Sequence, residues 1–192
     1  MNAHGVHSPF VYAFLTDGLY SGRRLRFTPE KGMSKKALQV LLATMRYFKS
    51  FKLLVLGEEA DAVTAMLRDV AEREQEKLWF FSELAPVPGG FDLGIVTGND
   101  TETIMPVFQR LLQDANHNSI IALADIHATP QREAAWEALK KAPNVTVTID
   151  TYHLGLIFIK AGQAKQHFVL RPFRSFMLDA LLGIRNLWGL LA

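Results

Sequence analysis

Residues 53–74 read LLVLGEEADAVTAMLRDVAERE, and this stretch decides the fold class. The first four residues form a short apolar run that ends at Gly57, as expected of a buried parallel strand. From Ala60 to Glu74 the apolar residues recur at three- and four-residue steps, which predicts an amphipathic helix. A buried strand that leads at once into a helix is the repeating unit of an α/β sheet.

The same alternation continues on both sides of this unit. Further helices are expected over three ranges: 34–49, 103–113 and 129–142. Further strands are expected over 78–81, 91–96 and 119–124. Residues 145–149 and 155–159 predict an antiparallel pair at a sheet edge. The expected fold is therefore α/β: a doubly wound, mostly parallel, Rossmann-like sheet with a C-terminal antiparallel hairpin.

The composition indicates one globular domain and excludes several kinds of site. The chain has 192 residues, of which 49% are hydrophobic and 21% charged. It has no cysteine, which excludes disulfides, zinc–thiolate sites and thiol nucleophiles. Residues 1–10 lack the pattern of a signal peptide, and no apolar run reaches the roughly 20 residues of a membrane span. We therefore expect a cytoplasmic protein.

The charges are distributed unevenly along the chain. Residues 1–52 contain nine Lys and Arg against two acidic residues, and residues 160–192 contain five against one. The middle of the chain is correspondingly acidic. This asymmetry fits solvated helix faces, or alternatively a docking surface for phosphate or anionic lipid. Aromatic residues are not interleaved with the basic ones, so we expect no nucleic-acid partner.

Polar residues follow several of the predicted strands. In doubly wound sheets ligands bind beyond the carboxyl ends of the strands, which is where Gly57, Glu83, Thr97 and Asp125 fall. His127, two residues after Asp125, has a side chain that could act as a general base near neutral pH. The alternative is a structural histidine that is hydrogen-bonded to a neighbouring backbone group.

Two segments resemble a known family. Residues 4–12 read HGVHSPFVY, and residues 124–173 read ADIHATPQREAAWEALKKAPNVTVTIDTYHLGLIFIKAGQAKQHFVLRPF. Both are similar to a group of class I S-adenosylmethionine (SAM) methyltransferase-like proteins found chiefly in Bacteroidetes. The resemblance implies cofactor contacts at Gly57, Glu83 and Thr97, with Glu83 on the ribose hydroxyls. No catalytic residue is expected, and Asp125 and His127 are the candidates if the chain is active.

The sequence departs from this family where the cofactor would bind. The turn at residues 56–60 reads LGEEA and has one glycine, and its two glutamates suit a helix N-terminus. Seven residues separate Glu83 from Phe91, too few for the further helix and strand that the family has there. The sheet should therefore be one strand–helix unit shorter than usual. Asp100 and Asp125 stand where the family has more acids, so we expect no metal site.

These departures predict a pseudoenzyme, meaning a methyltransferase-like chain that has lost SAM binding and serves as a non-catalytic binding or assembly module. On this interpretation no cofactor is expected. The alternative is an active SAM-dependent methyltransferase that acts on a small molecule through a trimmed pocket, with Gly57, Glu83 and Asp125 holding the cofactor. Methyl transfer depends mainly on proximity and orientation, which a reduced site could still supply.

The C-terminal end predicts a separate element. We place a methyltransferase-like domain at residues 1–173, with residues 1–33 as an N-terminal extension within it, and an amphipathic helix at 174–192. Apolar residues in that helix recur at three- and four-residue steps, so one face must be covered. Its own domain, a second subunit or a membrane surface could cover it. The expected partner is thus another protein or a second copy, with peripheral membrane contact as the alternative.

Overall fold

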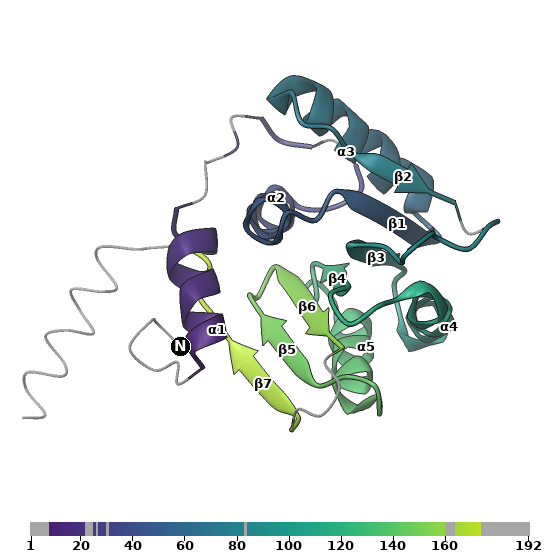
Figure 1. Cartoon of the computed structure of the whole chain (residues 1–192). Helices are drawn as coiled ribbons and strands as arrows, with labels where there is room; N and C mark the ends of the chain where they lie inside the picture. The colour runs from purple at the N-terminus through teal and green to yellow at the C-terminus, as the bar shows by residue number, and fades with distance from the viewer. Residues whose placement is uncertain are drawn as a thin grey trace, which may run out of the picture.

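In a computed structural model, which describes residues 8–21, 25, 27–29, 31–82, 84–159 and 164–173, the chain forms one seven-stranded sheet with helices on both faces (Figure 1). The strands are β1 Lys52–Gly57, β2 Trp79–Phe81, β3 Leu93–Thr97, β4 Ile120–Ala124, β5 Val147–Asp150, β6 Leu154–Phe158 and β7 Gln166–Val169. The helices are α1 Pro9–Ala13, the π-helix η2 Phe14–Leu19, α2 Lys35–Phe48, α3 Ala60–Glu74, α4 Thr101–Asp114 and α5 Pro130–Lys141.

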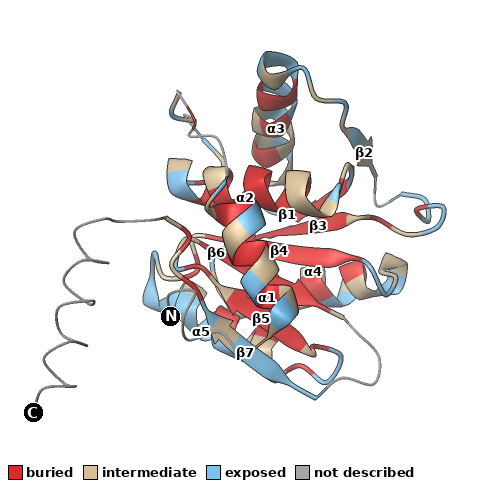
Figure 2. Ribbon diagram, turned by 60° about the vertical axis from the view of Figure 1, so that its left-hand side comes forward, coloured by how far each residue is buried: buried red, intermediate tan, exposed pale blue. Residues whose placement is uncertain are grey.

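The strand order is β2-β1-β3-β4-β6-β5-β7. Strands β2, β1, β3 and β4 are parallel, and β6 runs antiparallel to both β4 and β5. This is the predicted doubly wound, mostly parallel sheet with an antiparallel hairpin. Strands β3, β4 and β6 are buried throughout (Figure 2), which explains why they read as continuous apolar runs in the sequence.

Alternate residues of each strand build two separate cores. In β1, Leu53 and Val55 join a core with α1, η2, α2 and α3, whereas Leu54 and Leu56 join a core with α4 and α5. The large aromatic side chains follow the same division, since Phe14 lies in the first core and Trp136 in the second. The sheet is therefore covered on both faces along most of its width.

Local capping explains where three of the helices begin. The Ser34 hydroxyl accepts a hydrogen bond from the Ala37 amide at 3.2 Å, and the Thr129 hydroxyl accepts one from the Arg132 amide at 3.2 Å. Asp100 caps α4 by accepting from the Thr103 amide at 2.9 Å. The helix over 103–113 consequently starts two residues earlier than expected.

The sequence interpretation was incomplete at both ends of the chain. The predicted hairpin forms, but it is not at the sheet edge, because β7 pairs in parallel with β5 on its outer side. A four-residue strand with three exposed side chains carries little apolar signal, so it was not predicted. Within the predicted extension 1–33, α1 and η2 contribute buried Val11, Phe14 and Leu15 to the first core.

The connection from β2 to β3 is as short as the sequence predicts. Residues 82 and 84–92 contain no helix or strand. Strand β2 therefore lies at one edge of the sheet, with β1 as its single neighbour among the described strands.

Two predicted features lie outside the described residues: Glu83 and the amphipathic helix over 174–192. The boundary at residue 173 stays a prediction. Among the residues that the structure describes, none of the helices has the length and apolar character needed to cross a membrane.

Candidate functional site

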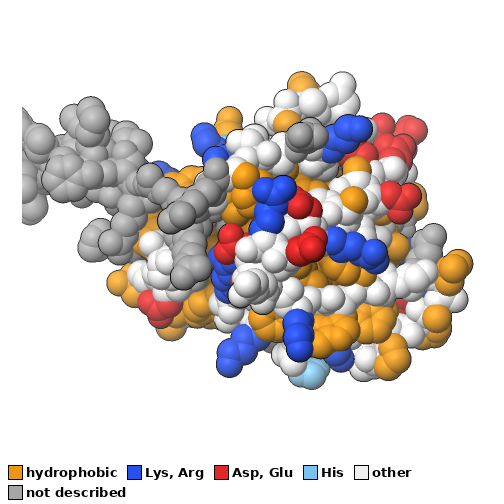
Figure 3. Space-filling model, turned by 90° about the horizontal axis from the view of Figure 1, so that it is seen from above, with side chains coloured by type: hydrophobic (Ala, Val, Ile, Leu, Met, Phe, Trp, Pro, Cys, Tyr) orange, Lys and Arg blue, Asp and Glu red, His pale blue; other side chains and the backbone are white. Residues whose placement is uncertain are grey.

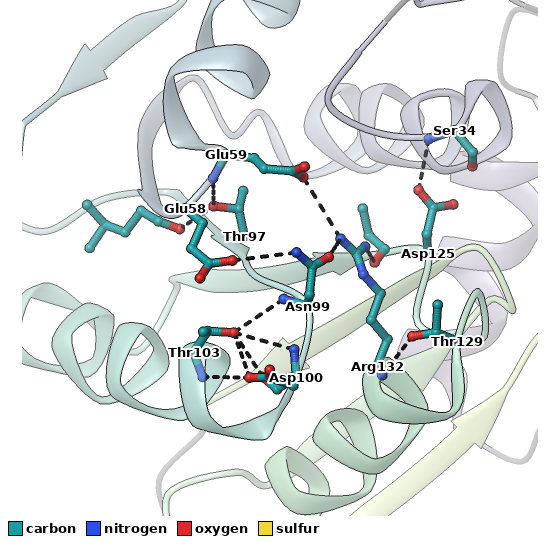
Figure 4. A network of polar contacts seen from close by, with 12 residues as sticks. Ser34, Glu58, Glu59, Thr97, Asn99, Asp100, Thr103, Asp125, Thr129 and Arg132 are labelled. Carbon is teal, nitrogen blue, oxygen red and sulfur yellow. Dashed lines mark hydrogen bonds and ion pairs between the residues drawn. The ribbon is translucent and has the colours of Figure 1, made fainter.

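The carboxyl ends of β1, β3 and β4 bring the predicted site residues to one edge of the sheet. Gly57 pairs with Thr97 in the parallel register of β1 and β3, and Asp125 directly follows β4. Figure 4 shows these strand ends joined by a network of polar contacts that also includes Glu59, Asn99 and Arg132. The edge is thus the natural place to look for a ligand site.

The close approach of Thr97 explains why residue 57 is a glycine. Its φ angle is +115°, and a Cβ atom at this position would lie 2.0 Å from the Thr97 carbonyl oxygen. The Thr97 hydroxyl donates to the Leu56 carbonyl oxygen at 3.0 Å and accepts from the Glu59 amide at 3.3 Å. Thr97, which is only 7% exposed, therefore fills the space beside this glycine and ties the β1 turn to β3.

Arg132 is the functional candidate that the sequence analysis missed. It lies in the first turn of α5, and its guanidinium donates to the Ala124 carbonyl oxygen at 3.0 Å and to the Asn99 side-chain oxygen at 3.1 Å. The same group lies 3.9 Å from a Glu59 carboxylate oxygen, and its side chain is 14% exposed. One cation thus bridges the ends of all three strands. The sequence carried no local signal for these contacts, because Asn99 and Glu59 lie far from Arg132 along the chain.

Asp125 has a structural role at the same edge. It has a left-handed backbone with φ +51°, and its amide donates to the His153 carbonyl oxygen at 2.6 Å. Its carboxylate accepts from the Ser34 amide at 2.8 Å. These bonds connect the segment that precedes α2 to the β4 end and to the β5–β6 turn.

His127 is surrounded by carboxylates. Its Nε2 lies 2.8 Å from Asp150 Oδ2, and its Nδ1 lies 3.4 Å from Glu133 Oε1. The Tyr152 ring stacks on the imidazole at 5.1 Å between ring centroids. Both ring nitrogens face side-chain acids, where the sequence analysis weighed a backbone partner. The hydrogen bond to Asp150 occupies Nε2, whereas the contact of Nδ1 with the exposed Glu133 is longer.

Asp100 and its surroundings offer no metal site. Hydrogen bonds from the backbone and side chain of Thr103 hold the pKa of Asp100 below its ordinary value, as expected for a carboxylate that caps a helix. In the described part of the chain, no three His, Asp or Glu side chains gather in a way that could hold a metal ion.

One open hollow lies next to this edge. It has a volume of about 420 Å³ and is lined by residues of β1, α3 and β2, including Gly57, Glu58, Asp61, Arg68, Phe81 and Ser82. This volume is at the lower end of the range for small-molecule sites. The hollow lies on the α3 side of Gly57, whereas Thr97 fills the β3 side.

On its β3 side, Gly57 does not offer the room that the SAM contact implied by the resemblance would use. That contact needs a glycine whose missing side chain leaves room for the ligand. At Gly57 the room is taken by the Thr97 backbone, 2.0 Å from where a Cβ would stand. The polar groups at the ends of β1, β3 and β4 bond to one another through Thr97 and Arg132.

The half-buried His153 at this edge leads to a pH prediction. Burial lowers its pKa below 6.5, Lys36 adds to the effect and Asp125 opposes it. The folded state thus binds fewer protons at this residue than the unfolded state. The contribution of His153 to the free energy of unfolding is present in full above pH 6.5. It is lost as the pH falls below that value.

We expect His153→Gln to reduce the loss of unfolding free energy between pH 7.5 and pH 5.5. Urea titrations at both pH values measure this loss of unfolding free energy. His117→Gln, which replaces an exposed histidine, is the control. An unchanged pH dependence in His153→Gln would contradict the assignment.

Comparison with known proteins leaves the family open. No protein-family model matches the chain, and no curated protein matches it. A protein from Klebsiella pneumoniae assigned as an O-methyltransferase has 12% identity and a TM-score of 0.42 over 70% of this chain and 84% of its own. The SAH-bound methyltransferase PaMTH1 from Podospora anserina has 15% identity and a TM-score of 0.45 over 79% and 94%. At these values neither protein assigns a family, a cofactor or an activity to this chain.

Proposed function

We propose that this chain is a methyltransferase-like protein of the Bacteroidetes type that has lost SAM binding and serves as a non-catalytic binding or assembly module. The main support is that the polar groups at the carboxyl ends of β1, β3 and β4 already bind one another. Thr97 fills the space beside Gly57, and Arg132 joins the ends of three strands. A ligand there would have to replace hydrogen bonds that the fold already makes.

The two candidates for catalysis, Asp125 and His127, also contact other groups of the protein. Asp125 accepts from the Ser34 amide, and His127 lies between Asp150 and Glu133. Separating either side chain from its partner would remove a hydrogen bond from a carboxylate, that of Asp125 or that of Asp150. We propose that both residues stabilise the strand ends and take no part in a reaction.

Isothermal titration calorimetry of the whole chain with SAM, and separately with its demethylated product, tests this proposal. We expect no binding heat for either compound. Binding of either with a micromolar Kd, about −8 kcal/mol, would overturn the proposal. Circular dichroism of the same sample confirms that the protein is folded during the titration.

An active small-molecule methyltransferase is the second candidate, and two observations favour it. Arg132 is a cation 3.9 Å from Glu59 that could offset the charge of that glutamate beside a ligand carboxylate. The hollow of about 420 Å³ borders Gly57. If this candidate is right, SAM binds to the unmodified chain and Arg132→Met weakens that binding. If the leading proposal is right, neither protein binds SAM.

We further propose that residues 174–192 mediate contact with another protein or a second copy of the chain, in the cytoplasm and without nucleic acid. The spacing of apolar residues in this segment is the support. Replacing both Leu181 and Leu187 with glutamate should abolish any self-association seen by sedimentation equilibrium, while Asn186→Glu on the polar side should not.

Membrane contact is the alternative for this segment. Co-sedimentation with phosphatidylcholine vesicles, with and without anionic lipid, distinguishes the two. Binding that requires anionic lipid and is lost in the Leu181→Glu, Leu187→Glu variant would replace the protein-contact proposal.

A further inference from the structure

Strand β2 forms an incompletely covered edge of the sheet. Phe80 packs with the first core, next to α3, and Phe81 packs with the second. Trp79 shares the face of Phe81, because side chains alternate along a strand, and it is 55% exposed. Among the described helices, α4 and α5 contribute to the second core, and they lie over other strands (Figures 1 and 2). On that face, no described helix covers β2.

The outer side of β2 offers backbone groups to a further strand. The Trp79 amide donates inward to the Phe51 carbonyl oxygen at 3.0 Å. Backbone groups alternate in direction along a strand, so the amide and carbonyl of Phe80 turn to the outer side. No described strand lies there. An extended segment could pair with this edge as an eighth strand.

A groove runs beside this edge. It has a volume of about 580 Å³ and is lined by α3 and by residues 76–81, and it shares Arg68, Phe80 and Phe81 with the hollow near Gly57. The groove thus continues along β2 towards the carboxyl edge. Figure 3, viewed from the α3 side of Figure 1, shows hydrophobic side chains among charged ones of both signs.

In the described part of the chain, neither cation of the groove has a carboxylate partner. Arg68 lies over the Phe80 ring at 5.2 Å, and Lys77 is exposed at the start of β2. Neither makes a hydrogen bond or ion pair with any residue in the described ranges, whereas the acid of the groove, Glu76, is bonded to Arg46 at 2.6 Å. Within the described residues, no bonded carboxylate therefore offsets the positive charge that Arg68 and Lys77 place next to the aromatic side chains of the groove.

We propose that the outer edge of β2 binds an extended acidic segment of a partner protein, in which carboxylates alternate with apolar residues. The carboxylates would face Arg68 and Lys77, and the apolar side chains would cover Trp79 and Phe81. A second copy of the chain fits less well. Antiparallel pairing of two β2 strands about Phe80 would bring two Arg68 guanidinium groups together, and like charges repel.

This inference specifies a partner for the proposed binding module but does not depend on the loss of SAM binding, since the two are measured separately. The probe is a fluorescein-labelled peptide of about 6 residues, the usual length of a strand, in which Glu and Val alternate. Its anisotropy is titrated with the whole chain. We expect a micromolar Kd that rises with salt, and binding at least tenfold weaker for the peptide in which Lys replaces Glu.

Protein variants locate the binding. Arg68→Gln combined with Lys77→Gln should weaken the Glu–Val peptide about tenfold, while Lys141→Gln, an exposed lysine in α5, should leave it unchanged. Hydrogen exchange monitored by NMR should show slower exchange of the Phe80 amide when the peptide is bound. Equal affinity for both peptides, no binding, or binding without protection of the Phe80 amide would each overturn the proposal, as would self-association that depends on Arg68 and Lys77.

Discussion

Gly57→Ala is expected to lower the free energy of unfolding by about 4 kcal/mol, the largest effect of any substitution considered at the carboxyl edge. The new Cβ would stand 2.0 Å from the Thr97 carbonyl oxygen and 2.6 Å from its hydroxyl oxygen. Both belong to a buried residue of the neighbouring strand, so neither can move without breaking the pairing of β1 and β3. The φ of +115° adds backbone strain. Urea denaturation measures the effect.

Gly89→Ala is the matched control for this substitution. Gly89 also has a positive φ, +73°, but a Cβ there meets no atom within 4 Å. It should cost only the backbone strain, about 1 kcal/mol. Similar losses at the two positions would mean that Thr97 does not occupy the space beside Gly57, and the internal packing of the site would be wrong.

Arg132→Met is expected to lower the free energy of unfolding by about 2 kcal/mol. The substitution removes the charged donor to the Ala124 carbonyl oxygen and to Asn99, and hydrogen bonds to a charged group are worth more than neutral ones. It also leaves Glu59 without the cation 3.9 Å away. Methionine keeps much of the apolar side-chain volume, so the loss reports the guanidinium.

The control is an exposed arginine. Arg73 pairs with Asp69 one helical turn away, and both side chains are more than half exposed. It also lies over the Phe27 ring at 5.0 Å. Arg73→Met should cost less than about 1 kcal/mol. An Arg132→Met variant as stable as Arg73→Met would show that Arg132 does not hold the strand ends together.

The central part of the fold could be predicted because its strands and helices carry clear periodic patterns. The predicted bounds of α3 match the structure at both ends, Ala60 and Glu74. The short connection after β2 could be predicted from length alone, since seven residues cannot span a helix and a strand. By contrast, β7 pairs four mostly exposed residues through its backbone, and backbone pairing leaves little trace in side-chain chemistry.

The site was harder to predict because its contacts join residues far apart in the sequence. Glycine after a strand suggests room for a ligand, but the same residue is required when a neighbouring strand approaches closely, as Thr97 does. Arg132 contacts Asn99, 33 residues away, and nothing near either residue in the sequence indicates this pairing. Asp100, where the sequence predicts no metal site, caps α4, a role that the sequence analysis did not assign to it.

A crystal structure of the chain soaked with S-adenosylhomocysteine tests the central claim most directly. We predict that Arg132 keeps its bonds to Ala124 and Asn99, that Thr97 stays against Gly57, and that no ligand density lies beside that glycine. Ligand density at Gly57, with its carboxylate on a displaced Arg132, would contradict the claim and establish a cofactor site.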